Sequence, residues 1–207
     1  TELNLLDGKA AANLALTGKQ EGTDFANSIL IGTTTTGTLD AATENILIGT
    51  RDYALTSGDS NVLLGGYTGD GITSGSYNVA LGRMALSVNS TAHYNVALGT
   101  YAMKVATGAA NTGVGYQAGT AVAAGEYNIC LGYQAGDNIT SGSGNVVIGK
   151  ADVSSATADD QLSISDGEDG SVVWMTGDSS GNVIHAGTTH AAGGQLTTTG
   201  KSLVMGF

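Results

Sequence analysis

Several residue types that build ordinary protein cores are scarce in this sequence. Its 207 residues contain no proline, one cysteine, one tryptophan and two phenylalanines. So few large aromatic side chains cannot fill a deep core, and the single Cys130 excludes a framework of disulfides within the chain. A collagen triple helix is excluded too, because it requires proline and a glycine at every third position.

Positive charge and long apolar segments are also lacking. The sequence has 7 basic residues against 18 acidic ones, which gives a formal net charge of −11. This balance predicts that nucleic acid and anionic membrane surfaces are not partners. No apolar run approaches the roughly 20 residues that a membrane-spanning helix needs, so we predict no membrane insertion.

What the sequence does contain is a short motif that recurs eight times: Asn (Ser28 in the first copy), apolar, small or apolar, apolar, Gly, as in NICLG at 128–132. The closing glycines, at steps of 16 or 17 residues, are Gly32, Gly49, Gly65, Gly82, Gly99, Gly115, Gly132 and Gly149. A fixed period of this length is the signature of stacked units. It is too short for two helices, and it matches one coil of a β-solenoid with two short strands and two turns.

The first strand of each coil presents side chains to two faces. Its outer residues, for example Val79 and Leu81, share one face, and we expect them to fill the inside of the coil. The middle residues then lack a partner within the chain, and they are Leu30, Leu47, Leu63, Ala80, Ala97, Gly113, Cys130 and Val147. An exposed row of this kind is typical of an interface between identical copies, so we predict that these residues form it.

Several stretches resemble known fibrous proteins. The NVALG and NVVIG strands, with the YQA and SGxYN turns, resemble the head repeats of trimeric adhesins of the YadA type, which also recur in bacteriophage tail fibres. TELNLLDG at the start and DDQLSISDGEDGSVVWMTGDSSGNVIHAG at 159–187 resemble segments of phage tail fibres. The adhesin repeat is usually a few residues shorter, which favours the phage family.

This resemblance implies a homotrimer. It also implies a parallel β-roll followed by an interwoven β segment, in an all-β chain. We expect a segment at 1–26 that leads into the first coil, with a helix conceivable at 9–16. Eight coils follow at 27–150, then a linker at 151–158 and a C-terminal intertwined β segment at 159–207. The second strand of each coil is expected directly after the glycine, as in RMAL at 83–86 and TYAM at 100–103.

Candidate contact residues are tyrosines that precede the repeat asparagine. Tyr77, Tyr94 and Tyr127 would stack along one side of the rod, where they offer apolar area with a polar tip to a receptor, or else form a packing ladder between coils. The repeat asparagines themselves are expected to form a hydrogen-bonded ladder. No catalytic motif, no metal-spaced set of ligands and no cofactor motif is found, and the acidic turn at 166–170 lacks the ligand pattern of a calcium loop.

The sequence thus predicts a structural and adhesive protein, not an enzyme. It would be a trimeric tail fibre on the outside of a phage virion, attached to other virion tail proteins and presenting or performing recognition of a host-surface glycan or protein. Three alternatives stay open. They are a bacterial trimeric surface adhesin, a polysaccharide-degrading tailspike, and an ice-binding solenoid, for which the threonines lack a common register.

Overall fold

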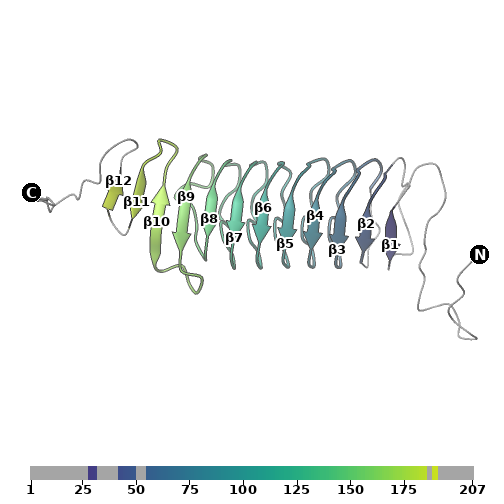
Figure 1. Ribbon diagram of the computed structural model, residues 1–207, viewed down its shortest axis with the longest axis horizontal. Helices are drawn as coiled ribbons and strands as arrows, with labels where there is room; N and C mark the ends of the chain where they lie inside the picture. The colour runs from purple at the N-terminus through teal and green to yellow at the C-terminus, as the bar shows by residue number, and fades with distance from the viewer. Residues whose placement is uncertain (1–27, 32–41, 50–54, 186–187, 191–207) are drawn as a thin grey trace, which may run out of the picture.

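The computed structural model describes the backbone of residues 28–31, 42–49, 55–185 and 188–190, and their side chains except those of Leu30 and 188–190. The predicted segment at 1–26, with its conceivable helix, and the final residues 191–207 lie outside this range. The described residues form an all-β structure in which one sheet runs along a rod (Figure 1). This confirms the predicted β-solenoid.

Nine parallel strands in chain order make up most of the described sheet. They are β1 (Ile29–Ile31), β2 (Ile46–Ile48), β3 (Val62–Leu64), β4 (Val79–Leu81), β5 (Val96–Leu98), β6 (Thr112–Val114), β7 (Ile129–Leu131), β8 (Val146–Ile148) and β9 (Leu162–Ser165). Each strand pairs with the next in register, so that Ala80 lies beside Ala97 and Ala97 beside Gly113. Branched residues favour these short extended segments.

Each coil contains one such strand, and the prediction of a second strand in each coil was wrong. The segments at 83–86, 100–103, 116–119 and 133–136 are turns. Within the coil that follows β4, Met84 and Leu86 both have positive φ, near 57° and 55°, and the same two positions after β5 are held by Tyr101 and Met103. Left-handed residues reverse the chain and are incompatible with an extended strand.

Hydrogen bonds between coils nevertheless continue through these turns. The N–H of Leu86 donates to the carbonyl of Ala102 at 3.1 Å, and the N–H of Met103 donates to the carbonyl of Ala118 at 2.9 Å. The turns therefore stack with the same register as the strands, which keeps every coil nearly identical.

The two faces of the strands are opposite to the prediction. The middle residues point into the coil, where Leu47, Leu63, Ala80, Ala97, Cys130 and Val147 are completely buried. Gly113 is buried as well, whereas the side chain of Leu30 lies outside the described part. The seven middle residues from Leu47 to Val147 therefore form the core within one chain, and their assignment to an interface between chains was wrong. The outer strand residues are exposed instead, as Leu81 shows with half of its surface accessible.

The volume available inside the coil explains this choice. Leu86 and Met103 lie on turns that face the strands and are also fully buried. Large residues on the turns occur in coils whose strands have a small middle residue. Leu86 follows the strand that contains Ala80, and Met103 follows the strand that contains Ala97. A methyl group on Gly113 or Gly119 would come within 2.8 Å or less of Met103 side-chain atoms. The interior of the coil is so narrow that it holds the side chain of only the middle residue of each strand, and not those of the two outer residues.

The solenoid also extends further than predicted. β9 pairs with β8 in parallel, with Val146 beside Leu162. The predicted linker at 151–158 is in fact the rest of this coil: Ala151 and Val153 are buried, and the N–H of Thr140 donates to the carbonyl of Ala156 at 2.8 Å. The motif search did not detect this coil because Gln161 replaces the usual asparagine and Ser165 replaces the usual glycine.

An antiparallel meander follows the solenoid. It consists of β10 (Val173–Gly177), β11 (Val183–His185) and β12 (Thr188–His190), which continue the same sheet from β9. This confirms the expected meandering β structure within 159–190, with the change of strand direction placed after β9. Trp174 and Ile184 are exposed on these strands.

Candidate functional surface

A buried ladder of asparagines starts the strands and is structural. Each asparagine accepts, through Oδ1, the N–H of the asparagine one coil later, as between Asn61 and Asn78 at 3.0 Å and between Asn128 and Asn145 at 3.0 Å. Gln161 continues the ladder, since its N–H donates to Asn145 Oδ1 at 2.9 Å. The members are fully buried apart from the slightly exposed Gln161, and they are Asn45, Asn61, Asn78, Asn95, Asn111, Asn128, Asn145 and Gln161. This confirms the ladder prediction and removes these amides from contact with a ligand.

An exposed apolar face lies on the outside of the strands. We call it the strand stripe, and it consists of the first and third residues of β1 to β8. Its most exposed members, between 37 and 50 % accessible, are Ile29, Ile46, Val79, Leu81, Val114, Ile129 and Ile148. Within the described residues no other segment of the chain covers this face. A long apolar face along a rod is typical of an association surface.

One row of turn residues precedes the asparagine ladder, and we call it the turn row. Its members share a left-handed backbone with φ between 54° and 69°, and they are Glu44, Ser60, Tyr77, Tyr94, Ala110, Tyr127, Gly144 and Asp160. The predicted contact residues all belong to this row. The rings of Tyr77 and Tyr94 stack with their centroids 5.2 Å apart and only 5° between their planes.

The third predicted contact residue does not join that stack. Tyr127 lies two coils beyond Tyr94, with Ala110 between them and Gly144 on its other side. It is 65 % exposed, more than any other large apolar or aromatic side chain among the described residues. The structure thus brings Tyr77 and Tyr94 together and leaves Tyr127 alone.

A second row of tyrosines, at the other end of the strands, was not predicted. Tyr116 and Tyr133 stack at 5.5 Å, and Tyr101 meets Tyr116 edge to face at 6.1 Å. Cations cap this row: Arg83 lies 5.6 Å from the Tyr101 ring centroid and Lys150 lies 5.5 Å from that of Tyr133. The signal in the sequence was an aromatic or basic residue one or two places after each motif glycine from Gly49 to Gly149.

The basic residues of the described ranges all lie on this second row. They are Arg83, Lys104 and Lys150, and Lys104 lies 5.6 Å from the Tyr101 ring centroid. The rings of this row therefore pack against one another and against cations, while Tyr116 and Tyr133 stay 42 and 48 % exposed. Such pairs stabilise the stack of coils, each by about 0.5–1 kcal/mol at an exposed site.

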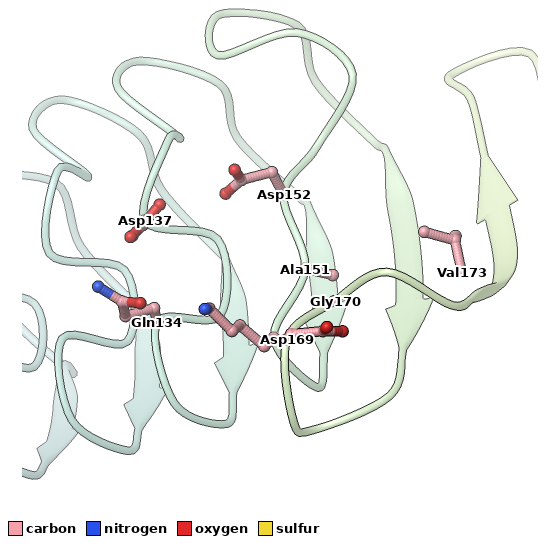
Figure 2. A pocket seen from close by; sticks show the side chains of 8 residues that line it. Gln134, Asp137, Ala151, Asp152, Asp169, Gly170 and Val173 are labelled. Carbon is pink, nitrogen blue, oxygen red and sulfur yellow. The ribbon is translucent and has the colours of Figure 1, made fainter.

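A shallow hollow of about 320 Å³ lies where the last solenoid coils meet the turn before β10. In Figure 2 the carboxyl groups of Asp137 and Asp152 lie on one side of it, with Asp169 on the loop at its base. Partial burial raises the pKa of Asp137, and the charge of Asp152 and a hydrogen bond to it raise this pKa further. Lys150 opposes this shift.

Metal binding finds no support in the described residues, where no group of three or more His, Cys, Asp or Glu side chains is placed to hold an ion. The acidic turn at 166–170 is organised from within. Asp166 Oδ1 accepts the N–H groups of Glu168, Asp169 and Gly170 at 3.0 to 3.1 Å, and Oδ2 accepts that of Val172 at 2.7 Å. These bonds lower the pKa of Asp166 to about 2.

The single cysteine is part of the core. Cys130 lies at the middle of β7 and is fully buried. Burial raises the pKa of its thiol to about 12, so it stays protonated and unreactive in the folded chain.

Comparisons with known proteins found no match to this chain. No family model matches the chain, and neither the curated proteins nor the solved structures contain a match. Within the part of the chain that the structure describes, no helix has the length and apolar character to cross a bilayer.

Proposed function

We propose that the chain forms a homotrimeric fibre segment of a phage virion that presents or performs recognition of a receptor on the host surface. The strand stripe carries this proposal. It extends over β1 to β8, its residues are branched and apolar except for Thr112, and no other part of the described chain covers it. Three copies meeting along this face would bury it, as closed symmetry requires of a self-association surface.

The solenoid geometry suits a fibre. Nine strands at about 4.8 Å spacing give a rod roughly 40 Å long for this segment. Each coil contacts only its neighbours, so length can be added without changing the core. The resemblance of the strand and turn motifs to phage tail fibres points the same way, and other virion tail proteins would hold its ends.

Recognition would be multivalent. Three chains present identical sites, and several fibres on one particle raise the effective concentration of those sites, so millimolar contacts suffice to hold the particle. The turn row supports a role in contact, because tyrosines there adopt a left-handed backbone that costs about 1–2 kcal/mol for residues other than glycine. Gly144 occupies the same row, so tyrosine is not required by the backbone.

Sedimentation equilibrium of the intact 207-residue chain tests the assembly. We expect the mass of three chains, independent of concentration. Leu81→Glu places a charge in the strand stripe and should yield monomers. Val88→Glu is the matched control, because Val88 is 49 % exposed against 50 % for Leu81 but lies on a turn. A monomeric wild type, or a Leu81→Glu variant that stays trimeric, would contradict the proposal.

A further inference from the structure

The turn row has a gap between two tyrosines. Tyr94, Ala110 and Tyr127 lie on successive coils with φ of 62°, 58° and 57°. The N–H of each donates to a carbonyl of the previous coil, at 3.1, 3.0 and 3.1 Å. Their Cα–Cβ bonds therefore leave the rod in equivalent directions, and Ala110 marks the coil where an aromatic ring is missing.

The gap has the thickness of one ring. Neighbouring rings of this row stack 5.2 Å apart, as Tyr77 and Tyr94 show. Tyr94 and Tyr127 are separated by two coils, or about 9.6 Å at ordinary strand spacing. This is close to the length of two successive stacking contacts, so one additional ring fits above the methyl group of Ala110.

Hydrogen-bonding groups also belong to the residues that directly precede Tyr94, Ala110 and Tyr127 in the sequence. The residue directly before each member of the turn row normally donates its N–H to a side chain of the next coil. Ser76 donates in this way to His93 Nδ1 at 3.0 Å, and Glu126 donates to Ser143 Oγ at 3.1 Å. Ala109 interrupts this row because it has no acceptor. Within the described residues the N–H groups of His93 and Ala109 have no protein acceptor, and the exposed carboxylate of Glu126 has no donor.

We propose that this gap binds one neutral pyranose ring of a host-surface glycan, held between Tyr94 and Tyr127. The inference rests on the proposed receptor-binding function and names its ligand class. The C–H faces of a sugar pack against tyrosine rings, while its hydroxyl groups can both accept from the two free N–H groups and donate to Glu126.

Other ring-shaped ligands fit less well. An aromatic side chain would cover the N–H groups of His93 and Ala109 without bonding to them, which is unfavourable. An acidic sugar would meet the Glu126 carboxylate and a chain of net charge −11. The second tyrosine row offers no comparable gap, because its stacked rings and their cations are in mutual contact.

Saturation-transfer NMR on the intact chain provides the test. The probes are free D-galactose, D-glucose, D-mannose and N-acetyl-D-glucosamine, with sialic acid and phenylalanine amide as competitors of other chemistry. We expect the wild type to bind at least one neutral sugar with millimolar affinity. Ala110→Tyr adds the missing ring and should lower this affinity about tenfold or more, because the added side chain occupies the place of the ligand.

Matched variants separate this site from the rest of the surface. Tyr127→Ala removes one wall and should also weaken binding about tenfold. Tyr133→Ala removes a ring of the second row that is 48 % exposed, against 65 % for Tyr127, and should leave binding unchanged. Sedimentation should give the same mass for all three variants, since none lies on the strand stripe.

Four results would overturn the inference: a wild type that binds none of the neutral sugars, an Ala110→Tyr variant that binds as well as the wild type, stronger binding of sialic acid or phenylalanine amide, or a changed mass for Ala110→Tyr. A trimer whose Ala110→Tyr variant still attaches to host cells would refute this site alone. A monomer that attaches to no host surface would refute the proposed function itself.

Discussion

At the scale of single residues, the asparagine ladder carries much of the stability of the rod. Asn128 Oδ1 accepts both the N–H and the Nδ2 of Asn145, at 3.0 and 2.9 Å. Its own Nδ2 donates to Asn111 Oδ1 and to the carbonyl of Gly142. All these groups are buried, so they have no water to replace a lost partner.

Asn128→Ala should therefore destabilise the fold strongly. We expect the free energy of unfolding to fall by about 2–3 kcal/mol, because a buried N–H and a buried carbonyl lose their partners. Urea denaturation at fixed protein concentration, followed by circular dichroism, measures this. Asn182→Ala is the control, since that amide bonds to Asp178 at an exposed site. Equal losses in the two variants would show that the ladder contributes no more than a surface bond.

At the scale of elements, turns rather than strands set the shape of each coil. Strands of three residues are too short to be stable alone, and the left-handed turn residues between them reverse the chain at fixed places. The turn between β9 and β10 uses a different device, because one carboxylate gathers four N–H groups. This turn is where the sheet changes from parallel to antiparallel pairing.

Asp166→Ala should loosen that turn without unfolding the solenoid. We expect faster hydrogen exchange at the amides of Glu168, Asp169, Gly170 and Val172, measured by NMR, while the Asn145 amide keeps its protection. Glu168→Ala is the control, because no hydrogen bond of its side chain holds the turn. Unchanged exchange in Asp166→Ala would contradict the role given to this carboxylate.

The same turn should depend on pH in the wild type. The pKa of Asp166 is lowered from 3.8 to about 2, so the ionised carboxylate is favoured in the folded turn. The stabilisation is present above pH 3.8 and is lost as the pH falls through about 2.

At the scale of the whole molecule, the solenoid behaves as a stack of nearly equivalent units. Contacts between strands join only neighbours in the chain order. The stability of such a stack is close to a sum over coils and the interfaces between them. Its length is therefore adjustable in steps of one coil.

Deletion of residues 116–132 should leave a shorter, folded rod. The cut removes 17 residues, and it joins Gly115 to Tyr133, which restores the Gly-Tyr-Gln-Ala sequence of the intact repeat. We expect an unchanged circular dichroism spectrum per residue and cooperative unfolding at a lower denaturant concentration. Deletion of 116–123 is the control, since it breaks the register of the asparagines and should unfold the neighbouring coils. Similar spectra for both deletions would contradict the stacked-unit description.

Much of the fold could be predicted because it repeats. The positions of β2 to β8 and the asparagine ladder follow from motifs of five residues that recur at one period. The last coil was missed since Gln161 and Ser165 replace the asparagine and the glycine that mark the motif. Tyr77 and Tyr94 could be recognised as stacked neighbours, but the second tyrosine row could not, because its members shift between one and two places after the glycine.

The sequence by itself determined the period, the parallel register and the place of every ladder asparagine, since each is a local pattern written once per coil. Only the tertiary structure decided which strand face lies inside. Alternation defines two apolar faces but does not rank them, and the width of the coil makes the choice. With Leu86 and Met103 already filling the interior from the turns, only the middle residue of each strand fits, and the outer residues are left to face solvent or another chain.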